Sequence, residues 1–235
     1  MSRTQLLLGD EKLERLINSH VLVVGLGGVG GICAEMIARS GVGEMTIVDG
    51  DVVEASNRNR QIPALSSTDN QPKAEVMAKR IRDINPDIKL NVHSRYLEEA
   101  DIKMLLESAQ FDYVVDCIDT LTPKVSLIKQ CLDRKLNVVS SMGAGGKVDP
   151  SAVQVSDISE SYNCKLAFYV RKRLYEMDIR SGFKVVFSTE IADRSNLVLL
   201  EKSTKRSVIG TISYMPAIFG CTMASVVIRD IAYGT

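Results

Sequence analysis

Short apolar runs rich in β-branched residues alternate along the chain with longer segments whose apolar residues recur at helical spacing. Residues 21–24 form such a run and lead into glycines, and residues 31–39 then follow a helical pattern. In residues 73–84, the apolar side chains at positions 76, 77, 81 and 84 fall on one face of a helix. Further strands are expected at residues 45–48, 89–92, 113–115 and 138–140, and further helices at residues 102–106 and 124–132. This alternation predicts βαβ units, and therefore an α/β fold with a doubly wound, mainly parallel, Rossmann-like sheet.

The rhythm changes after the glycine cluster at residues 143–146. Strands are expected at residues 153–155, 185–187 and 197–200, and helices at residues 166–177 and 216–231. No internal repeat, low-complexity tract or linker rich in Pro, Gly or Ser divides the chain. We therefore expect a single domain over residues 1–235, with a core at about 20–146 and a C-terminal α+β elaboration at about 147–235.

Composition narrows the class of protein. The 235 residues include 29 Lys and Arg against 29 Asp and Glu, and 45% of them are hydrophobic. These values are typical of a globular protein and exclude a disordered chain or a uniformly basic nucleic-acid coat, although a local basic patch stays compatible with them. The five cysteines are far apart and form no CxxC pair, so neither a disulfide framework nor a four-cysteine zinc site is expected.

The chain carries no segment that predicts membrane insertion or secretion. Charged residues follow the N-terminal leucine run at once, which is not the pattern of a signal peptide. The most apolar late stretch, residues 216–228, is shorter than the roughly 20 residues that a spanning helix needs. We expect a reducing, cytoplasmic setting and no membrane partner.

A glycine-rich sequence, GLGGVG, lies where the first predicted strand turns into a helix. Its glycines are Gly25, Gly27, Gly28 and Gly30. Glycines at such a turn let backbone N–H groups approach phosphates at the positive end of the helix. Asp49 ends the next strand, at the ribose-binding position of a dinucleotide fold. This pair alone is also compatible with glycines that only pack a helix on a strand, or with an NAD-dependent oxidoreductase.

The polar residues that follow favour a triphosphate over a nicotinamide. They are the acidic DGD at 49–51, SNRNRQ at 56–61, Lys73, and DCID at 116–119. Together they place cations, amides and carboxylates around the mouth of one sheet. Breaking an α–β phosphate bond needs cationic clamps and usually Mg²⁺, whereas hydride transfer leaves no triphosphate charge to neutralise.

These motifs resemble the adenylating superfamily of ubiquitin-activating enzymes and of ThiF- and MoeB-type activators of sulfur-carrier proteins. The resemblance covers about residues 6–146 and rests on GLGGVG, GVGEMTIVDGD, SNRNRQ, PKAE and VVDCIDT. Within the superfamily, INP at 84–86, SMGAGGKVDP at 141–150 and VVFSTE at 185–190 resemble tRNA threonylcarbamoyladenosine dehydratases. The likeness is weaker after residue 190.

The resemblance implies an ATP-dependent, adenylating enzyme with Mg²⁺ and a role for each matched residue. Asp49 would bind the ribose, Arg60 would stabilise the departing pyrophosphate, Lys73 would bind phosphate, and Asp119 would hold the metal. Arg3 would reach the phosphates of a neighbouring subunit, because the family is typically homodimeric. The implied nucleotide-binding residues are Gly25, Gly27, Gly28, Gly30, Asp49, Asp51, Ser56, Asn57, Arg60, Gln61, Lys73, Asp119 and Arg3. Arg60, Lys73 and Asp119 are the expected catalytic residues.

Single residues of these motifs also have simpler interpretations. Arg60 would then belong to a solvated loop, Lys73 and Arg3 to the surface, and Asp116 to the structural end of a strand. Cys117 is expected to be a small buried residue, and Cys33 to belong to the core. The intact set of polar residues argues against a catalytically idle nucleotide-binding scaffold.

The resemblance implies a tRNA substrate, namely the modified adenosine beside the anticodon. Sulfur-carrier activators typically carry two CxxC zinc pairs, which this chain lacks. Six basic residues lie within 165–184, and tyrosines flank them, as in surfaces that contact RNA phosphates and stack on bases. The candidate nucleic-acid residues are Lys165, Arg171, Lys172 and Arg173. The resemblance implies that the threonyl carboxylate is adenylated and that a nucleophile of the same side chain then closes a ring.

Alternatives remain for the partner and for the intermediate. The chain could instead activate the C-terminus of a sulfur-carrier or ubiquitin-like protein. A cysteine desulfurase or a sulfur-acceptor protein is a further partner to consider. Ring closure needs no enzyme nucleophile, but a cysteine-linked intermediate on Cys164 or Cys221 stays open.

Overall fold

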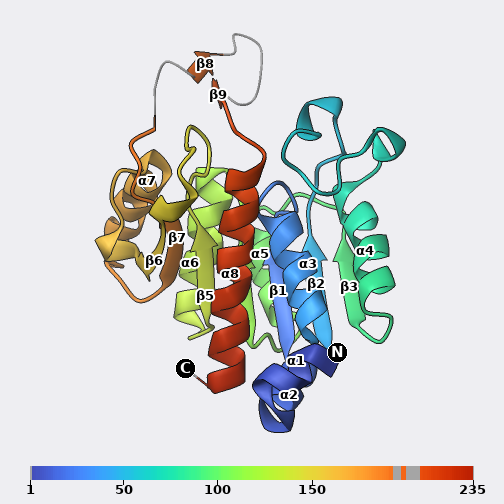
Figure 1. The fold of residues 1–235 in the computed structure, drawn as a ribbon. Coiled ribbons are helices and arrows are strands. Elements are labelled where there is room, and N and C mark those ends of the chain that lie inside the picture. Colours follow the sequence, from blue (N-terminus) through green and yellow to red (C-terminus); the bar gives the residue numbers. More distant parts are fainter. Residues whose placement is uncertain (1, 193–196, 200–206, 235) are drawn as a thin grey trace.

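A seven-stranded sheet forms the centre of the computed structural model, which describes residues 2–192, 197–199 and 207–234 (Figure 1). Its strands run in the order β3-β2-β1-β4-β5-β7-β6, and all neighbouring pairs are parallel except β6 with β7. The strands are β1 His20–Val24, β2 Glu44–Val48, β3 Lys89–His93, β4 Tyr113–Asp116, β5 Val138–Ser141, β6 Val153–Asp157 and β7 Lys184–Ser188. A separate antiparallel pair joins β8 Leu197–Leu199 to β9 Ser207–Ile209.

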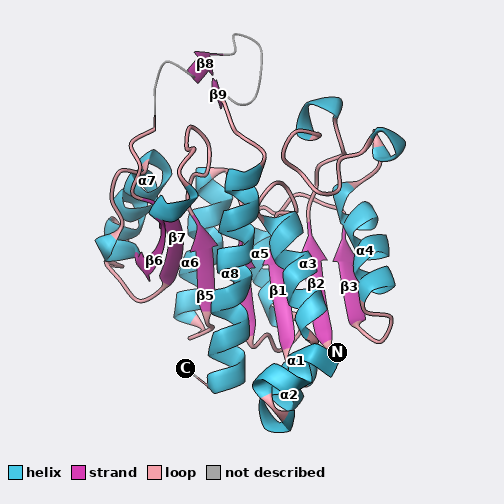
Figure 2. Cartoon of the chain, viewed as in Figure 1, coloured by secondary structure: helices cyan, strands magenta, loops and turns pink. Residues whose placement is uncertain are grey.

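Helices cover both faces of the sheet (Figure 2). The helices are α1 Ser2–Leu8, α2 Asp10–Ile17, α3 Gly30–Ser40, α4 Lys73–Ile84, α5 Glu99–Glu107, α6 Leu121–Asp133, α7 Lys165–Tyr175 and α8 Tyr214–Tyr233. Short 3-10 turns occupy Ala55–Asn57, Ser66–Thr68, Pro150–Ala152 and Ile158–Glu160. Helices α3, α4 and α8 pack into one core cluster, and α5, α6 and α7 pack into the other.

The alternation of side chains along β1 produces these two cores. Val21 and Val23 enter the cluster beneath α3 and α8, whereas Leu22 and Val24 enter the cluster beneath α5 and α6. Successive side chains of a strand point to opposite faces, and a strand buried on both faces is therefore apolar throughout. The doubly wound sheet predicted from the sequence is confirmed.

The connections place a topological switch point between β1 and β4. The chain passes from β1 to β2 and β3 on one side, and then returns to add β4 and β5 on the other. In open α/β sheets, ligands bind outside the carboxyl ends of the strands at such a point. The glycine loop after β1 and the DCID residues after β4 both lie there.

Helix α8 corrects one expectation about the C-terminal stretch. The helix spans 20 residues, Tyr214–Tyr233, and is long and apolar enough to cross a membrane by length and composition. However, 56% of its most apolar window is buried inside the protein, where α8 packs against α3 and α2. The position of the helix in the core therefore explains its hydropathy.

Each predicted strand and helix is present. The last residue of the strand predicted at 197–200, Leu200, lies outside the described residues. Two elements at the N-terminus, α1 and α2, and the late strand β9 were not predicted. Strands β6 and β7 belong to the part of the chain after residue 146, but they extend the same sheet as the strands of the predicted core. β7 pairs with the outer edge of β5, and β6 pairs with β7.

Candidate nucleotide site

The loop between β1 and α3 is closed so tightly that two of its glycines cannot be replaced. Gly25 has a φ of 88°, and a Cβ there would lie 2.8 Å from the Cys117 carbonyl oxygen. A Cβ on Gly30 would lie 1.7 Å from the Gly25 carbonyl oxygen. Internal packing thus accounts for these two glycines, in line with the simpler interpretation in which glycines only pack a helix on a strand.

The other two glycines of the motif have different surroundings. Gly28 lies against Pro216 at the start of α8, where a Cβ would meet the proline Cβ at 2.9 Å. Around Gly27 the nearest neighbour of such a Cβ is the Gln61 side chain, at an ordinary 3.7 Å. Gln61 Oε1 is buried and lacks a hydrogen-bond partner within the described part of the chain. A buried acceptor beside an open glycine is suited to a ligand that donates a hydrogen bond.

Asp49 connects the end of β2 to the glycine loop. Its Oδ2 accepts a hydrogen bond from the Leu26 N–H at 2.6 Å, and its Oδ1 accepts one from the Asp51 N–H at 2.7 Å. Burial raises the pKa of Asp49, and the two amide donors oppose that rise. Carboxylate oxygens have further lone pairs, so Asp49 can still accept hydrogen bonds from ribose hydroxyls.

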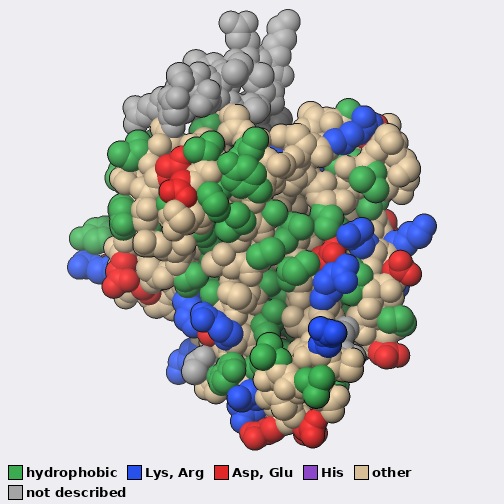
Figure 3. Space-filling view, viewed as in Figure 1, with side chains coloured by type: hydrophobic (Ala, Val, Ile, Leu, Met, Phe, Trp, Pro, Cys, Tyr) green, Lys and Arg blue, Asp and Glu red, His purple; other side chains and the backbone are tan. Residues whose placement is uncertain are grey.

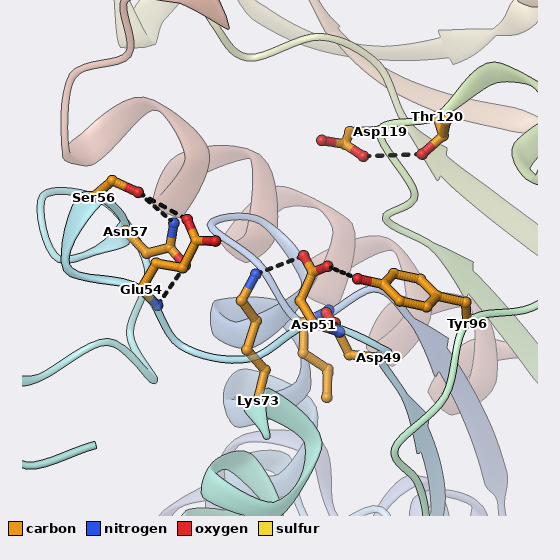
Figure 4. A network of polar contacts seen from close by, with 10 residues as sticks. Asp49, Asp51, Glu54, Ser56, Asn57, Lys73, Tyr96, Asp119 and Thr120 are labelled. Carbon is orange, nitrogen blue, oxygen red and sulfur yellow. Dashed lines mark hydrogen bonds and ion pairs between the residues drawn. The ribbon is translucent and has the colours of Figure 1, made fainter. Parts of the chain in front are cut away.

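Lys73 is a buried residue, and not the surface lysine of the simpler interpretation. It begins α4, and its Nζ donates to Asp51 Oδ2 at 2.8 Å. The hydroxyl of Tyr96 donates to Asp51 Oδ1 at 2.6 Å, so one carboxylate joins the two residues (Figure 4). Sequence reasoning missed Tyr96. The signal that could have found it is its position shortly after β3, the strand that pairs with β2.

The loop at residues 54–61 is folded upon itself. Asn57 is buried, its Oδ1 accepts from the Glu54 N–H at 3.2 Å, and its Nδ2 donates to Ser56 Oγ at 3.3 Å. The Arg60 Nη1 donates to the Ser56 carbonyl at 3.0 Å and to Asn59 Oδ1 at 2.8 Å. Asn57 is therefore fixed by its own 3-10 turn, and Arg60 is held to the same loop through Nη1, one of the three donor nitrogens of its guanidinium.

Asp119 follows β4 at the carboxyl edge and is exposed, with its Oδ1 accepting from Thr120 Oγ1 at 3.3 Å. Figure 4 places it across the site from the Asp51–Lys73 pair. Within the described ranges, no three His, Cys, Asp or Glu side chains gather as metal ligands. A single carboxylate fits Mg²⁺, which proteins commonly hold through one or two carboxylates together with substrate phosphates.

A buried ion pair supports the loop that carries Asp119. Asp116 ends β4, and its carboxylate meets the Lys124 ammonium with both side chains fully buried. Lys124 also donates to Ser140 Oγ and to the Ser141 carbonyl, each at 3.0 Å. The structural interpretation of Asp116 agrees with this arrangement. Lys124 was missed, because a lysine within a helical segment predicts a surface position.

The cysteines near the site have packing roles. Burial raises the pKa of the Cys117 thiol, and the Sγ of this residue lies 3.8 Å from Met223 Sδ. Cys33 is in the core, as predicted. Cys164 is buried at the start of α7, whereas Cys221 is exposed on α8.

The basic residues of α7 differ in their accessibility. Lys165, Lys172 and Arg173 are exposed, whereas the half-buried guanidinium of Arg171 donates to the carbonyl oxygen of Ser161 at 2.7 Å and to its hydroxyl. Three aromatic side chains are exposed on the helix, namely Phe168, Tyr169 and Tyr175, and the ring centroids of Phe168 and Tyr169 lie 5.3 Å apart. Arg171 therefore holds the turn before α7 in place, and the accessible cations are the other three.

Arg3 lies in α1, at the end of the molecule opposite the glycine loop (Figure 1). It lines a shallow hollow with Leu6 and Leu7, and both leucines are exposed. Arg3 is thus not brought together with the other predicted residues of its own chain. Its predicted contact with a neighbouring subunit stays a prediction.

Fold and site together define a Rossmann-like α/β protein with a nucleotide-binding edge. The chain belongs to the ThiF family, whose model matches residues 1–232. It is 38% identical to the tRNA threonylcarbamoyladenosine dehydratase of Bacillus subtilis over 242 residues, which covers 98% of this chain and 93% of that protein. The dehydratase of Escherichia coli is 39% identical over 195 residues, covering 80% of this chain and 72% of that protein. A crystal structure of the E. coli dehydratase with ATP matches with a TM-score of 0.90 at 33% identity, covering 99% of this chain and 93% of that one.

Proposed function

We propose that this protein is an ATP-dependent tRNA threonylcarbamoyladenosine dehydratase. The observation that carries the proposal is one continuous set of contacts at the carboxyl edge, which joins the glycine loop to Asp49, Asp51 and Lys73. Relatives named as this dehydratase match almost the whole chain, and one of them was crystallised with ATP and with AMP. Two adenylyltransferases of E. coli match less of the chain: the one for the sulfur carrier protein ThiS covers 61% of it, and the molybdopterin-synthase adenylyltransferase covers 64%.

The first chemical step joins the threonyl carboxylate to AMP. A carboxylate oxygen attacks the α-phosphorus of ATP, and pyrophosphate leaves. Asp49 would accept from the ribose hydroxyls, and backbone amides of the glycine loop would face the phosphates at the N-terminus of α3. Lys73 and Arg60 would take up the negative charge of the leaving pyrophosphate, for which an ammonium and a guanidinium are suited. Asn57, Ser56 and Gln61 would fix the loop that carries Arg60.

Asp119 would hold Mg²⁺ against the phosphates. When bound, the metal supplies positive charge that neutralises the triphosphate. In the second step, a nucleophilic atom of the carbamoyl group attacks the activated carbonyl and releases AMP, while the proton of that nucleophile leaves. The net change in the nucleoside is the loss of one water. No enzyme nucleophile is needed, because the attacking atom is already tethered to the carbonyl.

The exposed face of α7 would contact the tRNA. Lys165, Lys172 and Arg173 carry positive charge beside the exposed rings of Phe168 and Tyr169, as in surfaces that bind single-stranded RNA loops. Arg171 supports this surface through its bonds to Ser161. A tRNA substrate is consistent with a cytoplasmic setting.

The proposed functional unit is a homodimer. Figure 3 shows hydrophobic side chains along the middle of the face that α3 and α8 form. Partly buried apolar residues of that face, among them Met36, Ile228 and Ile231, border the core without being enclosed by it. A second copy of the chain would cover them, and the Arg3 of that copy could then approach a phosphate. A cysteine desulfurase or a sulfur-acceptor protein is a further partner to test.

Turnover with modified tRNA tests the proposal. Purified protein with ATP, Mg²⁺ and threonylcarbamoyl-modified tRNA should yield AMP, pyrophosphate and a nucleoside lighter by one water. Unmodified tRNA is the control and should release no AMP. If the protein instead adenylates the C-terminal glycine of a sulfur-carrier protein and leaves modified tRNA unchanged, the proposed substrate is wrong.

A further inference from the structure

Tyr96 is an exposed aromatic residue whose position at the candidate nucleotide site is nevertheless fixed. The side chain is 71% exposed, yet its hydroxyl donates to Asp51 Oδ1 at 2.6 Å. Its ring lies over Gly50, where a Cβ would approach the tyrosine Cγ to 2.6 Å and its backbone nitrogen to 2.5 Å. The absence of a side chain at position 50 thus makes room for Tyr96. Figure 4 shows the Tyr96 ring beside Asp51 and Lys73.

Asp51 is shared between Tyr96 and Lys73. The Lys73 Nζ donates to Oδ2 of the carboxylate at 2.8 Å, while the Tyr96 hydroxyl occupies Oδ1. Lys73 is buried, so its ammonium has little contact with solvent and relies on Asp51 as its anionic partner. To bind a phosphate, Lys73 has to move away from Asp51 or divide its donors between the two anions. The carboxylate then depends more strongly on its remaining donors, and the Tyr96 hydroxyl is one of them.

We propose that Tyr96 is a positioning residue for the triphosphate, because its hydroxyl holds Asp51 in place and so allows Lys73 to turn to a phosphate. The inference rests on the proposed function, in which Lys73 is the phosphate-binding lysine. Tyr96 acts through Asp51 and Lys73, and it does not touch the reacting atoms. The ligand it serves is therefore the phosphate chain of the nucleotide, and not the nucleoside.

The charge state of Tyr96 agrees with this role. The hydrogen bond to Asp51 raises the pKa of Tyr96 to about 12, with burial as a smaller cause. The hydroxyl therefore keeps its proton and stays a donor throughout the neutral range. A charge-assisted hydrogen bond of this kind is stronger than one between neutral groups.

Calorimetric binding of ATP and of adenosine to the full chain, measured separately without tRNA, tests the inference. Tyr96→Phe keeps the ring and removes the hydroxyl, and should raise the Kd for ATP about five- to tenfold while leaving the Kd for adenosine unchanged. Tyr233→Phe is the matched control, because it removes a hydroxyl from another exposed tyrosine at the far end of α8. Unchanged ATP binding by the Tyr96 variant would overturn the inference. Equal losses for ATP and adenosine would also overturn it, since they would assign Tyr96 to the nucleoside.

A double-mutant cycle separates action through Lys73 from a local structural effect. In a Lys73→Ala background, Tyr96→Phe should change the Kd for ATP by less than about twofold, because the hydroxyl no longer has a lysine to act through. A loss as large as in the wild-type background would contradict the inference. The binding assay omits tRNA, so a protein that binds ATP but leaves modified tRNA unchanged disproves the proposed function and still decides the role of Tyr96.

Discussion

Replacement of Lys124 by methionine measures how strongly the buried ion pair supports the loop that carries Asp119. Lys124 and Asp116 are both fully buried, and the ammonium also donates to Ser140 Oγ and to the Ser141 carbonyl. Methionine approximately keeps the length of the side chain and removes the charge. The Asp116 carboxylate then stays buried without its cation, between two strands at the centre of the sheet.

The size of the effect follows from the donors that remain. Loss of one partner of a buried ion pair costs about 3–5 kcal/mol. Ser140 Oγ and the Ile118 N–H still donate to Asp116, so we expect the lower end, about 3 kcal/mol. In a chain of this length each kcal/mol shifts the melting temperature by roughly 2–4 °C, which gives a decrease of about 6–12 °C.

Differential scanning calorimetry with a matched variant on the same helix tests this value. Lys129→Met removes an exposed lysine of α6 that pairs with Asp133, and should cost no more than about 0.5 kcal/mol. A second substitution, Asp116→Asn, added to Lys124→Met should recover part of the loss, because no buried charge then remains. Equal melting temperatures for the Lys124 and Lys129 variants would refute the structural role of the pair.

Three further perturbations address the metal, the RNA surface and the pH dependence. Asp119→Ala should reduce turnover at least about 100-fold with little change in melting temperature, because the side chain is exposed and is proposed to hold Mg²⁺; retained activity would remove that role. Reversing the charges of Lys172 and Arg173 should weaken binding of modified tRNA about tenfold or more and flatten its salt dependence, whereas an unchanged salt slope in a filter-binding assay would place the RNA elsewhere. Burial lowers the pKa of His20 below 6.5, so the unfolded chain binds the proton more readily and stability falls as the pH drops below that value. His20→Gln should therefore flatten the decrease in melting temperature between about pH 7 and 5.5, and an unaltered slope would exclude His20 as its source.

The sequence was sufficient to predict the sheet because the two signals for it, apolar strand segments and the glycines that follow the first of them, are local. Residues 21–24 are apolar at every position, as required of a strand buried on both faces, and the glycines that follow fit a turn where Gly25 has a positive φ. Asp49 could be placed at the carboxyl edge for the same reason, since it directly follows a predicted strand. Asp119 could be placed there because it lies in the short DCID segment that follows the predicted strand at 113–115.

Side-chain partners that come from distant segments could not be predicted in this way. Asp51 receives the Tyr96 hydroxyl from a loop 45 residues away and the Lys73 ammonium from the start of α4. Lys124 can be buried because an aspartate on one strand neutralises its charge and a serine on the next accepts one of its hydrogen bonds, and the sequence of its own helix reveals neither partner. Arg171 belongs to a basic run, yet its guanidinium is bound to Ser161. The sequence shows that such residues are charged, but only the fold determines which group pairs with each charge.

Isotope transfer from the substrate carboxylate tests the central claim most directly. Modified tRNA labelled with heavy oxygen in the threonyl carboxylate is incubated with the protein, ATP and Mg²⁺, and the nucleotide products are analysed by mass spectrometry. Because the carboxylate oxygen that attacks the α-phosphorus leaves with AMP, the account predicts AMP with one heavy oxygen atom, unlabelled pyrophosphate and a dehydrated nucleoside. Release of ADP with labelled inorganic phosphate, or of AMP without label, would contradict adenylation of the carboxylate.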